Sequence, residues 1–501
     1  MQRLSKAISV TLSAAIALGG CTTLTPKARP QAGPLPPQWT SAAAKPEAVS
    51  ATAWWEAFAD PTLQRLVAEG YDGNIPFQQA LLRVTEARAN ARVTLAQYLP
   101  NLSAQAQAQY QRVLQGPPLV GSFQQFITGG GGGTPTIITE DVQAFGGFGP
   151  RVSWEIPLFG ILPLAMRGAK LNKAIAAEEV RAAQVALVGD ISQAYIELRA
   201  AQNRWVALQR SLEVAEQLAG VLEGAVASGF TAPVDAADAR RQAEITRARL
   251  PDVAVQAYVA RARLALLRGL APGVEDVALD AALQAGAAVP TLAFPGPPAA
   301  PADLLRLRPD VARAERQALL AAVQVGVARH ELLPKLTITG DVNFARNIIG
   351  SPLPGQVGSL QVTPLFTVPL FDWGQRLAQA RVRKSQFEIA LLEYRGAVNQ
   401  AVAEADQALV ELEQAHARLQ ATQAAEASAA RLAEGARQAY AAGFRSLRER
   451  LQVEQLLQEA QLARIDAEAA QAQASIAAYR AFAGALAPPA QEQPAATPIS
   501  G

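Results

Sequence analysis

Two stretches of the chain alternate between apolar and polar residues. Leucine, alanine and tyrosine occupy every second position from Leu102 to Tyr110, and a similar alternation runs from Lys335 to Phe344. A period of two predicts β-strands with one apolar and one polar face. Each stretch has a candidate partner strand that closes on a proline, at about residues 149–159 and 359–371. We therefore predict two β-hairpins, spanning about 101–159 and 335–371.

Each predicted hairpin is followed by a long helical segment with apolar residues at heptad spacing. In the first, steps of four and three residues connect one continuous seam: Leu187, Ile191, Ala194, Leu198, Ala201, Trp205, Leu208, Leu212, Ala215, Ala219 and Leu222. Such a seam is typical of packed helices. From about Ala165 to Ala227 the helix has about sixty residues, which corresponds to about 90 Å. The seam recurs from Val398 to Leu419 and includes His416, which we expect to be packed between helices rather than to bind a ligand.

The chain consists of two copies of one unit. Asn74-Ile75-Pro76 and Arg308-Pro309-Asp310 open matching helical segments 234 residues apart, and Gly229-Phe230 matches Gly443-Phe444 at an offset of 214. Self-similarity of this kind indicates a duplicated architecture. The predicted divisions are a signal peptide (1–20), an N-terminal extended segment (21–60), a first repeat (61–287, with long helices to about 270), a Pro-rich linker (288–303), a second repeat (304–484) and a flexible tail (485–501).

The N-terminus has the pattern of a secretory signal peptide. Arg3 and Lys6 precede a short apolar run, Ala7–Leu18, which is too short to span a bilayer. The end of this segment, Leu18-Gly19-Gly20-Cys21, resembles the bacterial lipobox, in which the cysteine receives a diacylglyceryl group. Cys21 is the only cysteine of the chain. We therefore expect lipidation at Cys21; the alternative is an ordinary signal peptide with an incidental cysteine.

Composition and charge argue against several classes of protein. The chain has 45 Lys+Arg and 43 Asp+Glu, and removal of the signal peptide leaves 43 of each, so it has no net charge to attract nucleic acid. One cysteine cannot form an intramolecular disulfide, and two histidines argue against a His/Cys metal site. Nucleotide-binding glycine loops and nucleophile motifs are missing from the sequence. We expect no catalytic residue, no metal and no cofactor other than the lipid on Cys21.

Four strands raise a geometric problem. The sequence after the signal peptide contains no segment suited to a transmembrane helix, so any crossing of a membrane must be made by the strands. The smallest natural barrels have about eight strands. If the predicted hairpins span a membrane, several chains must share one barrel. The alternative is that both hairpins lie on the surface of a soluble β-domain.

Short motifs throughout the mature chain point to one known family. They are Cys21 with its lipobox, Trp54-Trp55, Asp60-Pro61, Arg308-Pro309-Asp310-Val311, Leu333-Pro334, Pro369-Leu370-Phe371 with Gly374, and Tyr440 with Gly443. In this order the chain resembles the TolC-like outer-membrane efflux protein family, in its lipoprotein (NodT/OprM-like) branch that serves RND-type pumps. The resemblance implies a mainly α fold with transmembrane β. In that fold three chains build one α-barrel duct and one shared outer-membrane β-barrel, with four strands from each chain.

The resemblance also implies a function and partners. It predicts the outer-membrane channel of a tripartite RND-type efflux system, a passive gated exit duct for drugs or other small toxic compounds. The implied partners are two further copies of the chain, a periplasmic adaptor (membrane fusion) protein, an inner-membrane RND transporter and outer-membrane lipid. The chain would be lipid-anchored in the outer membrane and extend into the periplasm. Two alternatives stay open, a duct for type I secretion and a structural lipoprotein that spans the envelope.

The same resemblance points to a periplasmic gate at the helix tips, beside the turns at Gly229 and Gly443. The family's gate positions match Asp235, Tyr440, Arg445 and Glu449. Hydrogen bonds and ion pairs at these positions close the pore in the family, and each such contact is worth about 1 to 3 kcal/mol, which suits a switch. Glu449 replaces the family's usual aspartate, so closure should be looser here. The alternative is that all four are solvated residues near helix ends.

Overall fold

The computed structural model describes residues 25–26, 29–40, 54–112, 142–284, 288–291, 308–349 and 356–482. Several expectations from the sequence fall outside this part of the chain. They concern the signal peptide 1–20, the lipidation site Cys21, most of the linker 288–303 and the tail 485–501.

The chain divides into two compact units that do not follow the two repeats. Unit 1 comprises Met1–Pro30, Glu86–Ala174 and Arg316–Leu391, and unit 2 comprises Gln31–Thr85, Ile175–Glu315 and Leu392–Gly501. Each unit therefore combines segments from both copies of the sequence repeat. The duplication describes the order of elements along the chain, whereas the units describe how those elements pack.

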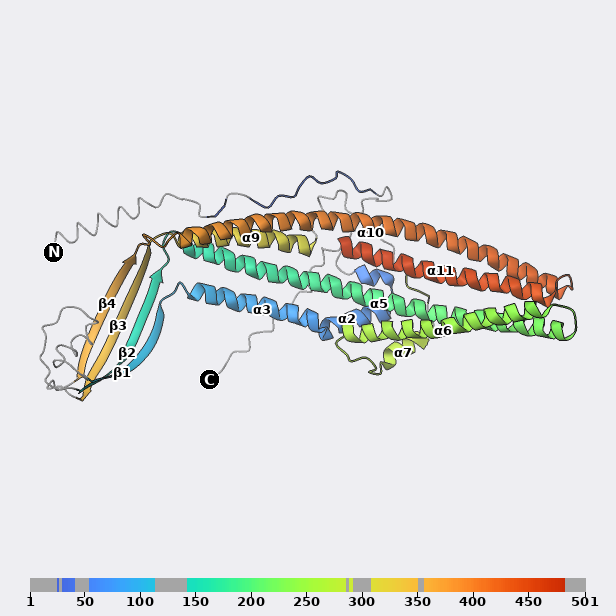
Figure 1. Ribbon diagram of the computed structural model, residues 1–501, viewed down its shortest axis with the longest axis horizontal. Coiled ribbons are helices and arrows are strands. Elements are labelled where there is room, and N and C mark those ends of the chain that lie inside the picture. Colours follow the sequence, from blue (N-terminus) through green and yellow to red (C-terminus); the bar gives the residue numbers. More distant parts are fainter. Residues whose placement is uncertain are drawn as a thin grey trace. The chain divides into compact units, whose positions relative to one another are not determined.

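Unit 1 contains a four-stranded antiparallel sheet in the order β1-β2-β3-β4 (Figure 1). The strands are β1 Asn101–Arg112, β2 Val142–Ile156, β3 Lys335–Ile349 and β4 Gln356–Thr367. The predicted pairing of β1 with β2 and of β3 with β4 is confirmed. The predicted bounds were partly wrong. β2 begins earlier because its pairing continues to Arg112 opposite Val142, and β4 ends earlier because the residues after Thr367 form the turn into the next helix.

The register of the sheet gathers the apolar positions of all four strands on one face. Leu102 lies opposite Val152, Val152 opposite Gly340, and Gly340 opposite Val362. The neighbouring row, Ser103, Arg151, Asp341 and Gln361, lies on the other face, where Arg151 and Asp341 form an ion pair of 3.7 Å. The predicted alternation is confirmed. The apolar face is not covered, because large side chains on it are exposed: Leu102, Phe148, Leu360, Val362 and Phe366.

The helices of the two copies have nearly equal lengths. α3 (Ile75–Ala96) and α9 (Pro309–His330) have 22 residues each, and α5 (Ile161–Ala227) and α10 (Gln375–Ala441) have 67 each. The last helices are α6 (Pro233–Leu267), with 35 residues, and α11 (Leu447–Phe482), with 36. At about 1.5 Å per residue, α5 and α10 extend about 100 Å each and α6 and α11 about 50 Å each. The matching lengths confirm the duplication that the sequence predicts.

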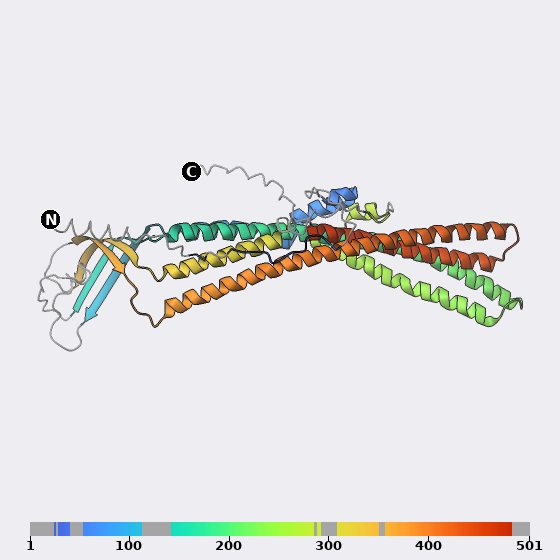
Figure 2. The same cartoon turned by 90° about the horizontal axis from the view of Figure 1, so that it is seen from above.

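Unit 2 is built from antiparallel helix pairs. α10 and α11 run side by side from a common turn (Figures 1 and 2), packed through Ala433, Ala436, Val453 and Leu457. α5 and α6 pack similarly through Leu218, Leu222, Ala236 and Ala239. The predicted seam of α5 is buried from Leu187 to Leu222, apart from the half-buried Trp205 and Leu212. Alanine at many seam positions lets the helices approach closely.

One seam prediction is wrong. His416 is exposed and forms a hydrogen bond of 3.0 Å with Gln420 on its own helix. The seam itself continues, because the next seam residue, Leu419, is buried. The exposure is therefore local to His416, whose polar ring avoids the cost of burial without a partner by staying in contact with solvent.

Two short helices near the middle of unit 2 were not predicted as separate elements. α2 (Pro61–Gly73) begins at Asp60, whose Oδ1 accepts hydrogen bonds from the backbone N–H groups of Thr62 (2.8 Å) and Leu63 (3.2 Å). α7 (Val277–Gln284) begins after Asp276. With the 3-10 turn η1 (Trp54–Phe58), these elements pack on α5, α6 and α11 in the main core of the unit. An acidic residue before proline or an apolar run is a recognisable helix start.

Among the described residues, none of the helices is both long enough and apolar enough to cross a lipid bilayer.

Candidate functional site

The helices of both hairpins reverse at glycines in the left-handed conformation. Gly229 has φ +74° and Gly443 has φ +76°. At each turn the N–H of the following phenylalanine donates 2.8 Å to a carbonyl five residues earlier, from Phe230 to Ala225 and from Phe444 to Ala439. These bonds define the Schellman arrangement that ends many helices. The two tips therefore have the same backbone design.

The residue after each tip glycine is an exposed phenylalanine. Phe230 is 86% exposed and Phe444 is 85% exposed. In a Schellman turn the residue at this position commonly packs back onto the preceding helix turn, but neither side chain does so. The Gly-Phe pair occurs in both repeats of the sequence, but the exposure of its phenylalanine was not predicted.

Asp235 lies in the first turn of α6 and connects the two hairpins. Its carboxylate accepts a hydrogen bond of 2.8 Å from Thr231 Oγ1. Its Oδ2 also lies 3.9 Å from Nη1 of Arg448, in the first turn of α11, and both side chains are about two-fifths exposed. The family resemblance points to Arg445 as a gate residue. The arginine that approaches Asp235 within this chain is Arg448, three residues further on.

Glu449 caps its own helix. Its Oε2 accepts hydrogen bonds from the N–H of Ser446 (2.8 Å) and from the hydroxyl of Ser446 (3.0 Å), while the Ser446 hydroxyl accepts from the N–H of Glu449 (3.2 Å). This is a capping box. The hydrogen bonds from the Ser446 N–H and hydroxyl, together with the charge of Arg445, lower the pKa of Glu449. Glu449 therefore stays ionised beside the exposed Arg445.

Tyr440 has a cationic neighbour. The guanidinium carbon of Arg450 lies 5.2 Å from the centre of the Tyr440 ring, within the range of a cation–π contact. Further along the same hairpin, Arg437 of α10 forms two hydrogen bonds with Glu454 of α11, of 2.5 and 2.9 Å. The candidate gate residues thus have separate partners: Asp235 with Arg448, Tyr440 with Arg450, and Glu449 with Ser446. Only Arg445 and Glu449 interact with each other, through charge.

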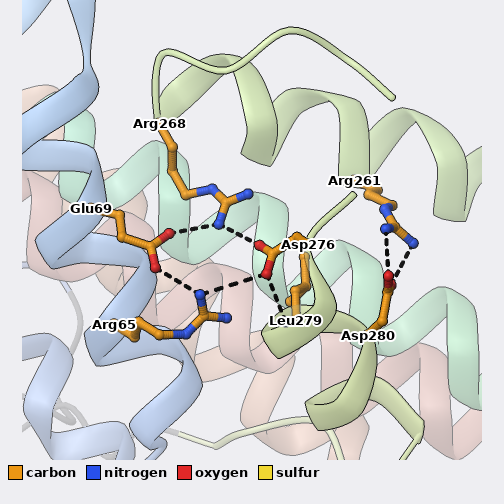
Figure 3. A network of polar contacts seen from close by, with 7 residues as sticks. All are labelled: Arg65, Glu69, Arg261, Arg268, Asp276, Leu279 and Asp280. Atoms are coloured by element: carbon orange, nitrogen blue, oxygen red, sulfur yellow. Dashed lines mark hydrogen bonds and ion pairs between the residues drawn. The ribbon is translucent and has the colours of Figure 1, made fainter. Parts of the chain in front are cut away.

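A second polar cluster joins the middle of α2 to the C-terminal end of α6 and to the residue before α7 (Figure 3). Arg268 Nη1 lies 2.6 Å from Glu69 Oε2 and 2.5 Å from Asp276 Oδ2. Arg65 Nη1 contacts the same two carboxylates from the other side, at 2.7 and 3.7 Å. The Arg268 side chain is only 4% exposed. We call these four residues the buried network.

The buried network includes the start of α7. The Asp276 carboxylate accepts 2.9 Å from the N–H of Leu279 (Figure 3). Burial alone would raise the pKa of Asp276, but the Leu279 N–H and the charges of Arg268 and Arg65 lower it below its ordinary value. This cluster was not predicted from the sequence, because its members are up to 211 residues apart, from Arg65 to Asp276, and carry no motif.

Unit 2 also has an open groove of about 900 Å³ between α5, α10 and α11. Its lining mixes alanines with both signs of charge, including Arg308, Glu404 and Arg418. Arg308 lies 2.7 Å from Asp310 and 2.6 Å from Glu404. Within the described part of the chain, no group of three or more His, Cys, Asp or Glu side chains is arranged to hold a metal ion.

These features define a class of protein: a duplicated chain with a sheet that exposes an apolar face, and with two long helical hairpins that end in matching tips. The chain belongs to the outer membrane efflux protein family, which matches residues 72–270 and 300–484. The matched ranges lie on both copies of the repeat.

Individual relatives agree with this assignment. The pyoverdine export outer membrane protein OpmQ of Pseudomonas putida is 28% identical to the chain, over 94% of the chain and 96% of OpmQ. The probable outer membrane lipoprotein SilC of Salmonella typhimurium is 26% identical, over 77% of the chain and 78% of SilC. The solved structure of the outer-membrane channel OprN superposes with a TM-score of 0.76 at 25% identity, over 92% of the chain and 98% of OprN.

Proposed function

We propose that this chain is the outer-membrane channel of a tripartite RND-type efflux system, a passive duct through which drugs or other small toxic compounds leave the cell. The observation that carries the proposal is the match to the outer membrane efflux protein family across both copies of the repeat. The two faces of the sheet support it, because an apolar face suits lipid and a polar face suits an aqueous interior. The groove with mixed charges suits a duct that accepts many compounds.

The working form is a homotrimer. In the described part of the chain β1 pairs only with β2, and β4 pairs only with β3, so each sheet has two edges that can pair with neighbouring copies. Unpaired strand edges are not tolerated within a bilayer. Three copies contribute twelve strands, which is enough to close a membrane barrel. Cys21 carries the lipid that anchors each copy in the outer membrane, as the lipobox-like sequence indicates, and the long helices extend into the periplasm.

The helix tips contact a periplasmic adaptor protein, which links the duct to an inner-membrane RND transporter. Phe230 and Phe444 support this, because each tip presents a large apolar side chain to solvent. Exposed apolar groups framed by polar residues are typical of protein interfaces. The transporter supplies the free energy, since the duct itself is passive.

The tips also carry the gate. The contact between Asp235 and Arg448 joins the α5–α6 hairpin to the α10–α11 hairpin, and Arg450 covers Tyr440 beside it. Arg445 and Glu449 complete the group. Because the Asp235–Arg448 pair is exposed, we revise its value from about 1 to 3 kcal/mol, as expected from the sequence, to about 0 to 1 kcal/mol, so an adaptor can replace it at little cost. Because Glu449 already accepts two hydrogen bonds from Ser446, its part in closure is smaller than that of Asp235.

Removal of the chain from its own host tests the proposal. We expect cells without it to accumulate a fluorescent cationic dye, and we expect the wild-type gene to restore its export. Unchanged dye export with loss of a secreted protein would favour the type I secretion duct. If both kinds of export stay intact while the envelope changes, the structural lipoprotein would be favoured instead.

A further inference from the structure

A cluster of exposed apolar side chains follows the last strand in unit 1. Leu370 is 90% exposed, Phe371 is 76% exposed and Trp373 is 91% exposed. The rings of Phe371 and Trp373 lie 4.9 Å apart. We call these three residues the junction cluster, because they lie between β4 and α10. Isolated exposed apolar residues are ordinary, but three within four positions form a patch that is typical of an interaction surface.

The backbone holds this cluster outward. Trp373 has φ +54° and Gly374 has φ +79°. The Asp372 carboxylate fixes the turn by accepting hydrogen bonds from the N–H groups of Gly374 (3.1 Å) and Arg376 (3.2 Å). A bulky residue at positive φ is unfavourable, and such strain is found mainly where function requires it. Glycine would adopt the backbone conformation of position 373 without strain, so we infer that the Trp373 side chain has a function.

The matching junction of the first copy is different. Phe159 and Gly160 repeat the same pair of positive φ angles, +51° and +76°, but the next residue, Ile161, is buried against Leu164 and Val323. Phe159 is exposed too, but at 39% it is less exposed than Phe371 or Trp373. The two copies therefore share a backbone turn with an aromatic residue at positive φ, and the second copy exposes the larger aromatic surface.

The junction cluster continues the apolar face of the sheet. Phe366, on that face of β4, and Val368, just after the strand, are also exposed. The ends of β2, β3 and β4 that connect to helices lie together at this end of the sheet, because Leu336 pairs with both Ile156 and Phe366. The apolar surface thus extends past the end of the sheet to Trp373.

The N-terminal segment reaches the same part of unit 1. The methyl group of Thr25 lies 3.2 Å from the point that a Cβ on Gly326 would occupy, and a Leu164 methyl group lies 2.8 Å from that point. Leu164 is in the first turn of α5. Thr25 lies four positions after Cys21 in the sequence, a reach of at most about 14 Å. The proposed lipid on Cys21 is therefore confined to the region of the strand-to-helix junctions.

We propose that the junction cluster inserts into the headgroup and acyl boundary of the periplasmic leaflet of the outer membrane, the same leaflet that holds the lipid on Cys21. Tryptophan and phenylalanine are favoured at this depth because they combine apolar area with tolerance of a polar boundary. The cluster then fixes the depth of the sheet, and the acyl chains hold it in place. This inference rests on the proposed function, in which the sheet spans the outer membrane.

Site-directed spin labelling in vesicles of phosphatidylethanolamine and phosphatidylglycerol tests the inference. Cys21 is the only native cysteine, so in the lipidated protein an introduced cysteine is the only free thiol. Phe371→Cys and Trp373→Cys report on the cluster, with Val362→Cys on the apolar sheet face and Phe444→Cys at a helix tip as references. Depth is measured from label accessibility to oxygen and to a water-soluble nickel chelate. We expect both cluster labels about 5 to 10 Å below the phosphates, the label at 362 deeper, and the label at 444 in water.

Two results would overturn the inference while the proposed function stands. In the first, the label at 362 lies in the bilayer, but the labels at 371 and 373 are as accessible to nickel as the label at 444. In the second, the cluster labels are immobile and shielded from both reagents, which shows that a second copy of the chain covers them. If the label at 362 is also in water, the proposed function itself fails. Phe371→Cys keeps the test valid if Trp373→Cys does not fold, because Phe371 is not at positive φ.

Discussion

The helix tips and the buried network use the same chemistry, arginine with carboxylate, in opposite ways. At the tips, Arg448 lies 3.9 Å from Asp235 and both side chains are about two-fifths exposed. In the network, Arg268 is 4% exposed and lies 2.6 Å or less from two carboxylates. Exposed pairs contribute little to stability, whereas loss of one partner from a buried pair leaves an unpaired charge. The first arrangement is suited to reversible contacts and the second to a fixed joint.

The backbone is also packed more closely at the network than at the helix tips. At the network, α2 and α6 approach so closely that a Cβ on Gly73 would lie 2.0 Å from the carbonyl oxygen of Arg268, and Asn74 Nδ2 donates 2.9 Å to the carbonyl of Leu267. At the tips, a Cβ on Gly229 or Gly443 would meet no atom within 4 Å. The network therefore joins helices through backbone and side chains together, and the tip contacts depend on side chains alone.

Loss of the central arginine of the network should have the largest effect on stability. Arg268→Met leaves Asp276, 13% exposed, and Glu69, 37% exposed, with Arg65 as their remaining partner, and we expect a loss of about 3 kcal/mol, the lower end for a broken buried pair. Thermal unfolding in detergent, followed by circular dichroism, measures it. Arg261→Met is the matched control, because Arg261 pairs with the more exposed Asp280 at 2.7 Å. Equal effects of the two variants would contradict the distinction.

Loss of the close backbone approach between α2 and α6 at the network should have the second largest effect on stability. Gly73→Ala puts a methyl group against the backbone of Arg268, and overpacking of this kind costs about 1 to 3 kcal/mol. Gly396→Ala is the control, since its Cβ would meet no atom within 4 Å and it lies in the interior of α10. There alanine should stabilise by about 0.5 to 1 kcal/mol. If both substitutions stabilise, the joint is looser than described.

Acid should weaken the network through Asp276. Its pKa is lowered in the folded state, so its ionised form stabilises the fold above the pKa of the unfolded chain, near 4. That stabilisation is lost as the pH falls through the folded pKa. The stability difference between wild type and Asp276→Asn should therefore be constant above about pH 5 and shrink below about pH 4. A difference that stays the same at pH 6 and pH 3 would argue against the charge as the cause.

The tip pair should have the smallest effect on stability. Asp235→Ala and Arg448→Ala should each change the free energy of unfolding by less than about 1 kcal/mol, because both groups are exposed and 3.9 Å apart. The same unfolding assay measures this. A loss comparable to that of Arg268→Met would mean that the tip pair is structural and would remove the contrast between the two regions.

The sequence predicted the regular parts of the fold because periodicity is local. The alternation around Leu102 predicted the strands, the heptad seam through Ile191 predicted the long helices, and the tip glycines predicted the turns. Neither α7 nor the buried network was predicted, because Arg65 and Asp276 meet only after α2 and α6 have packed. Nor did the sequence indicate that Arg448 lies near Asp235, since that contact joins two hairpins more than 200 residues apart in the sequence.

Planar-bilayer conductance of the purified protein tests the central claim, that this is a duct closed by exposed contacts at the helix tips. The variants are Asp235→Ala/Arg448→Ala and the control Glu223→Ala/Arg240→Ala, which removes an exposed pair of 2.6 Å within one hairpin. We predict small resting currents for wild type and control, and a clear rise for the tip variant. Large currents in all three, or equal small currents in all three, would contradict the account.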